Sequence, residues 1–286
     1  MTLILSWNIQ NGKGIDGVIS LERIAEVITA MGDPDVICLQ EVSTHLQLIE
    51  DGPAPDQVAQ ISALFPDYEM IFGAAVEAGQ DGATPRWQFG NATLTRLPVL
   101  SVFHHPLPQP AESGIRHMPR QATEVTIATR LGPLRVINTH LEFHSAKQRL
   151  AQVGRLRELH EENVLNIQTP PEHNMAGAYQ NIARPEDCII CGDFNMETDF
   201  GEYDAMLAPL TTGVPGFQDA WQIVHPDQAH EPTCGIHDHD QWPQGPHCRD
   251  FFFVTDAIAR ATEGVTVDTK TNASDHQPLM LRLADA

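Results

Sequence analysis

Eight polar residues of this sequence stand where short apolar runs end or in the polar loops that follow them. Carboxylate and amide oxygens are ligands that suit Mg²⁺ or Mn²⁺, and no paired thiolates occur among these residues to favour zinc. Histidines beside carboxylates can orient or exchange protons near neutral pH. A hard metal, a base and two histidines would form a site where water attacks a phosphoester. The eight residues are Asn8, Glu41, His140, Asp193, Asn195, Asp250, Asp275 and His276.

The segment around Asp193 shows the pattern most clearly. Residues 188–191 form a short apolar run that predicts a buried strand, and Gly192 ends it. If the chain stays extended, Asp193 and Asn195 point to one side while Phe194 turns into the core. An ordinary Gly-Asp turn at the end of a strand is the alternative interpretation.

A β-α-β unit is expected at the start of the chain. The apolar run 3–7 predicts a strand, residues 21–31 have helical spacing, and 36–39 predicts a second buried strand. If the two strands are parallel, Asn8 and Glu41 approach each other at their carboxyl ends.

The rest of the chain supplies further strand ends and one long helix. The middle of the chain is expected to be antiparallel, with an irregular proline-rich connection at 106–119. His140 follows the strand 134–138, and Ser145 with Gln148 predicts a capping box at the start of the next helix. The other expected strands are 68–72, 91–95, 100–107, 121–129, 251–254, 265–267 and 278–283; helices are expected at 57–64 and 219–224, partial helix at 197–210, and loops at 77–88 and 168–183.

Length and composition favour a globular protein. The chain has 286 residues, 42% of them hydrophobic, and shows no linker or repeat, so we expect a single domain over residues 1–286. No apolar stretch approaches the length of a membrane span, and the apolar segment 3–5 lacks the basic flank and length of a signal peptide. We therefore expect a cytoplasmic protein.

The charge balance bears on the partner. Lysine and arginine number 17 against 38 aspartates and glutamates, which gives a formal net charge of −21. This average field repels the phosphates of a duplex, so long duplex nucleic acid is a disfavoured partner unless a local basic patch exists.

The cysteines do not form the pattern of a disulfide-stapled domain, because five in a chain of this length are odd in number and sparse. Cys188 and Cys191 have the C-x-x-C spacing of a redox or zinc motif. Positions three apart in a strand face opposite sides, however, so we do not favour that interpretation.

The stretch 234–248 is rich in histidine and aspartate and is open to two interpretations. It could hold a second, structural metal ion, or it could be a solvated polar loop. We favour the loop, which together with Trp242 would form the rim of the substrate cleft because it directly precedes Asp250.

Six short segments that contain the candidate residues follow one another from end to end of the chain. They are Ser6-Trp7-Asn8, Leu39-Gln40-Glu41-Val42, Asn138-Thr139-His140-Leu141, Gly192-Asp193-Phe194-Asn195, Arg249-Asp250-Phe251 and Ser274-Asp275-His276. In this order they resemble the endonuclease/exonuclease/phosphatase superfamily, also called the deoxyribonuclease I-like family. Each segment alone is a weak motif, but all six in order are specific. The family often has an Ile-Asp-Tyr-Ile-Phe type of run where this chain has Arg-Asp-Phe-Phe-Phe, and the aspartate is kept.

This resemblance implies a fold and a set of residue roles. The fold is an α/β, four-layered sandwich, in which two mixed β-sheets pack face to face and are flanked by helices. Glu41 would be the principal Mg²⁺ (or Mn²⁺) ligand, with Asn8 and Asp275 on or near the metal. The catalytic residues would be Asp193, which orients and deprotonates water; Asn195, which holds the phosphate or that water; His276, oriented by Asp250; and His140 on the leaving-group side.

The resemblance fixes the bond class and leaves the substrate open. We expect a metal-dependent phosphoesterase acting on a phosphodiester of a small molecule, a lipid or a single-stranded nucleic acid. A DNA or RNA endo- or exonuclease is one alternative, and a non-catalytic binding module with the same fold is another. Candidate substrate contacts are Arg149, which the family pattern also allows as a brace, Trp87 and Trp242.

Overall fold

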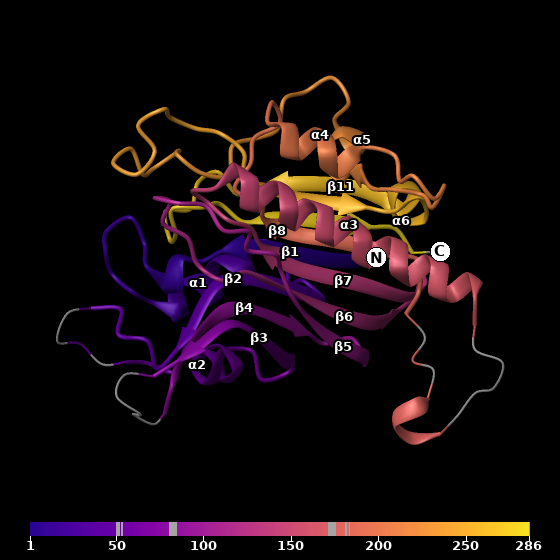
Figure 1. Ribbon diagram of the computed structural model, residues 1–286. Coiled ribbons are helices and arrows are strands. Elements are labelled where there is room, and N and C mark those ends of the chain that lie inside the picture. The colour runs from indigo at the N-terminus through magenta and orange to yellow at the C-terminus, as the bar shows by residue number, and fades with distance from the viewer. Residues whose placement is uncertain are drawn as a thin grey trace.

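The computed structural model describes residues 1–49, 52, 54–79, 85–170, 176–180, 182 and 184–285. Within these residues, two mixed β-sheets of six strands each pack face to face, and helices cover their outer faces (Figure 1). The expected four-layered α/β sandwich is therefore confirmed.

The first sheet is built around a parallel pair of strands, β1 and β2. Helix α1 (Leu21–Ala30) connects them, and the side chain of Ser20 caps the helix by accepting a hydrogen bond from the Arg23 amide. The other neighbours in this sheet are antiparallel. In spatial order the strands are β11 (Thr262–Val267), β12 (Leu279–Leu283), β1 (Thr2–Asn8), β2 (Val36–Thr44), β4 (Trp87–Thr95) and β3 (Glu69–Ala78).

The second sheet repeats this plan around the parallel pair β7 and β8. The long helix α3 (Ala146–Gln168) lies between these strands in the sequence, and the remaining neighbours are antiparallel. In spatial order the strands are β5 (Val99–Pro106), β6 (Gln121–Thr129), β7 (Gly132–His140), β8 (Cys188–Asp193), β10 (Asp250–Val254) and β9 (Gln218–Asp219).

Shorter helices complete the layers. The Ser145 hydroxyl caps α3 as expected, but Gln148 does not complete the capping box, because its Oε1 accepts no hydrogen bond from the described residues; its Nε2 donates to the Pro110 carbonyl. The other helical segments are α2 (Gln57–Leu64), α4 (Gly201–Leu207), α5 (Ala220–Val224), α6 (Asp256–Ala261) and the 3₁₀ turns Gln10–Gly12 and Gly177–Tyr179. None of the helices in these described ranges has the length and apolar character needed to cross a bilayer.

Three apolar clusters hold the layers together. One lies between the sheets and contains Val36 and Val136; a second packs α3 and α4 onto the second sheet; a third packs α1 and α2 onto the first. Cys188 belongs to the second cluster and Cys191 to the cluster between the sheets, so the two thiols face opposite sides of β8 as expected. All five cysteines are free and buried.

The structure corrects several expected boundaries. β2 continues to Thr44, and the predicted loop 77–88 is instead partly the β3–β4 hairpin, in which Ala78 pairs with Trp87. Residues 80–84 of that loop, and 171–175, 181 and 183 of the loop predicted at 168–183, lie outside the described residues. Helix α6 was not expected, because six residues are too few to show a clear helical period.

Gly192 is a position where the fold depends on a missing side chain. A methyl group there would lie 1.8 Å from the Thr139 carbonyl oxygen of the neighbouring strand β7, and its φ of +141° disfavours other residues. We predict that Gly192→Ala lowers the free energy of unfolding by several kcal/mol, measured by chemical denaturation. Gly154→Ala is the matched control, because nothing lies within 4 Å of it and helix propensity favours alanine by about 0.5–1 kcal/mol. Equal losses in the two variants would contradict this packing argument.

Candidate active site

The predicted site residues meet where the two parallel strand pairs end. Asn8 ends β1, and His140 and Asp193 end β7 and β8, where they are register partners. The Asn8 amide donates to Glu41 Oε1 at 3.2 Å and to Asp193 Oδ2 at 3.0 Å. One side chain of the first sheet thus holds carboxylates from both sheets together.

A β-bulge in β2 aims Glu41. Leu39 pairs with Ala92 and Val42 with Gly90, so two residues of β2 face one residue of β4. Glu41 has a φ of +56°, in the left-handed region that costs a residue with a side chain about 1–3 kcal/mol. The strain is concentrated at the residue whose carboxylate points toward Asn8.

A buried polar link fixes the sheets beneath the site. The Gln40 amide donates to Asn138 Oδ1 at 2.8 Å, and the Asn138 amide donates to the Ala92 carbonyl at 3.0 Å. Both side chains are fully buried, so unmade bonds there would be costly.

Asp193 lies at the centre of the cluster and is 1% exposed. Its Oδ1 accepts the Asn195 amide N–H at 2.9 Å, and its Oδ2 lies 3.4 Å from His140 Nε2 and 3.6 Å from His276 Nε2. Burial alone would raise the pKa of Asp193, but the charge of His276 together with the hydrogen bonds from the Asn8 amide and the Asn195 N–H outweighs burial and lowers the pKa below its usual value. Asp193 is therefore an anion able to accept a proton.

His276 is the cationic partner. Its Nδ1 lies 2.8 Å from Asp250 Oδ2, which also accepts the Thr233 hydroxyl at 2.6 Å. Burial would lower the pKa of His276, but the charges of Asp250 and Asp193 raise it well above its ordinary value. The imidazolium is thus flanked by two carboxylates.

His140 is neutral. Burial, followed by the nearby positive charge of Arg120, lowers its pKa to about 3. The Asn195 amide donates to the Leu141 carbonyl and to His140 Nε2, each at 3.0 Å, which leaves the ring proton on Nδ1. The two histidines of the site therefore have different protonation states.

Glu41 and Asp275 form the group best suited to a divalent cation. Burial and then the negative charge of Asp275 raise the pKa of Glu41 to about 7, and burial also raises the pKa of Asp275. Two such carboxylates offer hard oxygen donors that suit Mg²⁺ or Mn²⁺. The Asn8 side chain presents its NH₂ group to Glu41, and its oxygen accepts the Gln10 N–H at 3.1 Å. A second group, Asp193, Asp250 and His276, places ligand atoms within 4.8 Å of one another. Both ring nitrogens of His276 already face carboxylates, so that group is better explained by the Asp250–His276 hydrogen bond and the His276–Asp193 ion pair.

A profile of the Endonuclease/Exonuclease/phosphatase family matches residues 5–276. The chain belongs to this family. No curated protein matches the chain. Members of the endonuclease/exonuclease/phosphatase family hydrolyse phosphoester bonds.

Solved structures of the family share the fold over their whole length or most of it. An endonuclease/exonuclease/phosphatase from Beutenbergia cavernae has 24% identity and a TM-score of 0.63, over 99% of this chain and 72% of the other. A mannosyl-6-phosphatase from Bacteroides thetaiotaomicron has 19% identity and a TM-score of 0.67, over 99% and 100%. A 3′ phosphatase from Neisseria, bound to product DNA hairpin, has 19% identity and a TM-score of 0.60, over 99% of each chain.

The stretch 234–248 packs against His276 of the candidate active site through Trp242. The indole is 2% exposed, its ring lies 6.1 Å from the His276 ring, and the Arg249 guanidinium lies 4.7 Å from its centroid. All residues of this stretch are described, and they contain no group of three potential metal ligands. The structure thus gives no support to a second metal site in this stretch. The buried Trp242 ring packs edge-on against the His276 ring.

Arg149 and Trp87 are placed less directly. The buried Arg149 guanidinium donates to Glu202 at 2.9 Å and to the carbonyls of Glu142 and Phe143, which favours the bracing role over substrate contact. Trp87 is the first residue of β4. Its neighbour Gln88 pairs with Thr44 of β2, three residues beyond Glu41, so Trp87 lies apart from the cluster of site residues.

Arg120 and Glu142 are site residues that the sequence analysis missed. The Arg120 guanidinium lies 3.6 Å from Glu142 at the end of β7, and its charge acts on Glu41 and Asp193. Arg120 directly precedes the strand predicted at 121–129, which pairs antiparallel with the strand that leads to His140. This antiparallel pairing, in which Ala122 lies opposite Thr139, places Arg120 near His140 and could have identified it as a site residue.

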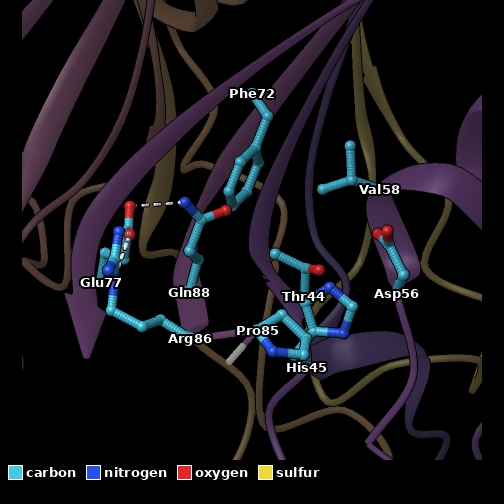
Figure 2. Close-up of a pocket in the computed structure, with 9 residues that line it drawn as sticks. All are labelled: Thr44, His45, Asp56, Val58, Phe72, Glu77, Pro85, Arg86 and Gln88. Atoms are coloured by element: carbon cyan, nitrogen blue, oxygen red, sulfur yellow. Dashed lines mark hydrogen bonds and ion pairs between the residues drawn. The ribbon is translucent and has the colours of Figure 1, made fainter. Parts of the chain in front are cut away.

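A separate hollow of about 440 Å³ lies beyond the end of β2, between the β3–β4 hairpin and α2. Figure 2 shows its mixed polar and apolar lining, in which the Gln88 amide donates to Glu77 at 2.8 Å and Arg86 pairs with the same carboxylate. None of the predicted site residues lines it.

The raised pKa of Glu41 predicts that the metal-free protein becomes less stable toward unfolding as pH rises. Below about pH 4.5, Glu41 is protonated in both the folded and the unfolded protein. Between about pH 4.5 and pH 7, Glu41 is ionised in the unfolded protein but still protonated in the folded one, so the free energy of unfolding falls as pH rises. We predict that Glu41→Gln raises the free energy of unfolding of the metal-free protein by about 1–2 kcal/mol at pH 8 and by little at pH 5. The value at pH 8 is reduced for solvent screening because Glu41 is only half-buried. Mg²⁺ should stabilise the wild type and not the variant in thermal unfolding. A less stable variant at pH 8 would contradict the expectation.

Asp250 should control the charge of His276. Removing its carboxylate in Asp250→Asn takes away the largest stabilising charge, so the pKa of His276 falls and the imidazolium is lost at lower pH than in the wild type. NMR titration of the imidazole protons measures this shift. Glu202→Gln, at the Arg149 brace, serves as a control that should leave the titration unchanged. The same titration curve for wild type and Asp250→Asn would count against the pairing.

Proposed function

We propose that this protein is a metal-dependent phosphoesterase that hydrolyses a phosphodiester by attack of water. The observation that carries the proposal is the buried anion Asp193 set 3.6 Å from the imidazolium of His276, beside the paired acids Glu41 and Asp275. This combination provides a proton acceptor, a cation and a hard ligand set in one place.

Asp193 is the residue suited to activate water. Its Oδ1 is held by the Asn195 N–H and its Oδ2 by the Asn8 amide, so the carboxylate has a fixed orientation. As an anion with a low pKa, it would hold the attacking water and take up its proton. Asn195 fixes neutral His140 through its amide, which places that imidazole next to Asp193 for a role toward the leaving group.

His276 is the residue suited to stabilise phosphoryl charge. Its Nε2–H is directed toward the Asp193 side of the site, and Asp250 holds the ring through Nδ1. A fixed donor that is already charged stabilises negative charge developing on a phosphoryl oxygen, because it need not reorganise during the reaction.

Asn8, Glu41 and Asp275 would hold Mg²⁺ or Mn²⁺. When bound there, the cation would polarise the phosphoryl group and offset its charge. The raised pKa of Glu41 means that this carboxylate accepts a proton near neutral pH in the absence of a cation, so metal binding should weaken below about pH 7.

The substrate we favour is small or single-stranded. The net charge of −21 opposes tight binding of long duplexes, and the His140 motif followed by the helix that carries Arg149 resembles the phosphodiesterase branches of the family. Two of the structural relatives are phosphatases, a mannosyl-6-phosphatase and a 3′ phosphatase, so a monoester is the competing substrate class.

Hydrolysis of two nitrophenyl esters tests the proposal. We predict release of nitrophenol from bis(nitrophenyl) phosphate with Mg²⁺ or Mn²⁺, its loss with chelator, and a decrease of about 10²–10⁴-fold in kcat for Asp193→Asn. Activity on nitrophenyl phosphate alone would replace the diester with a monoester. Unchanged activity of Asp193→Asn would refute the assigned base, and silence of the metal-loaded wild type on esters of both classes would favour a binding module.

A further inference from the structure

Phe143 is an exposed aromatic residue beside the proposed reaction centre. It lies three residues beyond His140 in the chain. The Leu141 carbonyl accepts a hydrogen bond from the Asn195 amide at 3.0 Å, and the Phe143 carbonyl accepts one from Arg149 Nη1 at 3.1 Å. These bonds fix the backbone, while 37% of Phe143 remains exposed. Phe143 therefore presents an open surface on the His140 side of the site.

The ring of Phe143 is supported by Arg249 and Trp242. The Arg249 guanidinium lies 5.5 Å from the centroid of the Phe143 ring, and the Trp242 ring lies 5.6 Å away at an angle of 65°. Arg249 also donates to the Asn195 carbonyl at 3.3 Å and to His247 Nε2 at 2.8 Å, so its position is fixed. Arg249 and Trp242 are only 8% and 2% exposed. Of these three packed side chains, Phe143 is therefore the one that a ligand can reach.

A second loop extends the apolar surface around Phe143. The Met118 N–H donates to Glu142 Oε2 at 3.3 Å, and Arg116 Nε donates to the imidazole of the residue after Phe143 at 3.1 Å. The loop 115–118 thus lies against the residues on both sides of Phe143. Ile115 and Met118 are 36% and 41% exposed. Exposed apolar side chains that occur singly are ordinary, but three on two adjoining loops beside a reaction centre favour a binding surface.

We propose that Phe143 is a specificity-determining residue whose open ring stacks on a planar aromatic group carried by the phosphoester. This inference rests on the proposed function, because it names the class of substrate that the same site takes. Phenyl and nucleobase rings share the required chemistry, since each has a flat apolar face that stacks on an aromatic side chain. Ile115 and Met118 extend the apolar surface beside that group. Stacking does not depend on net charge, so it adds affinity where the charge of −21 opposes an anionic substrate.

Calorimetric titration of phenylphosphonate and methylphosphonate into the metal-loaded protein tests this contact. Both compounds carry the same anionic group and only the first carries a ring, so the ratio of their affinities measures the ring contact. We expect the wild type to bind phenylphosphonate about five- to tenfold more tightly than methylphosphonate. Phe143→Ala should abolish this advantage and Phe143→Leu should lose most of it, because an aliphatic side chain cannot stack. Phe143→Tyr should retain it.

Tyr179→Ala is the control for loss of an exposed aromatic residue. Tyr179 is 83% exposed and belongs to the turn Gly177–Tyr179, which lies away from both sheets in Figure 1. This variant should keep the wild-type ratio. Equal affinities for the two phosphonates in the wild type, or an advantage that Phe143→Ala or Phe143→Leu keeps in full, would overturn the inference. If Phe143→Ala does not fold, Phe143→Leu carries the comparison.

Two further arms separate the source of the ring and the fate of the proposed function. Weaker binding of thymidine monophosphate to Phe143→Leu than to the wild type would assign the ring to a nucleobase, and unchanged binding would assign it to an aryl ester that is not a nucleotide. The titrations need no turnover. A ring advantage in a protein that hydrolyses no ester would refute the function and keep the ring site, whereas hydrolysis without that advantage would keep the function and overturn the inference.

Discussion

The shared amide of Asn8 is the contact on which the site depends. Its two N–H groups bind Glu41 of the first sheet and Asp193 of the second. Without that amide, the carboxylate of half-buried Glu41 and that of buried Asp193 would have less to offset their mutual repulsion. The sheets beneath are fixed by the Gln40–Asn138 hydrogen bond, so the distance between the acids is set by packing and not by flexible side chains.

The protonation states divide the site into two regions. Asp193 between His140 and His276 forms a region where one anion meets a neutral and a cationic imidazole. Glu41 and Asp275 form a second region in which unbalanced negative charge is held together by the fold. The phosphoester that we propose as substrate would need local positive charge in a protein of net charge −21, and His276 and Arg120 are cationic residues at the site.

The strand-end pattern predicted much of the fold and site, because hydrophobic runs and the residues after them are local in the sequence. It brought together Asn8, Glu41, His140 and Asp193, and the parallel pairing of β1 with β2 follows from the helix between them. The β2 bulge could not be predicted, since it depends on how β4 pairs with Gln40 and Glu41. Arg120 was missed for a related reason: it lies between the proline-rich connection 106–119 and β6, and only the pairing of β6 with β7 places it beside His140.

The two ends of the sequence meet at His276. The Trp7 indole donates to the His276 carbonyl across 269 positions, and the Ser274 hydroxyl donates to the Asn8 carbonyl across 266. Such distant contacts form late, after the loop-closure entropy of the intervening chain has been overcome. On the ribosome, the nascent chain therefore has no complete set of site residues until residue 276 has emerged and docked on β1. Translation products that end before residue 276 would lack this imidazolium and therefore the complete set of site residues.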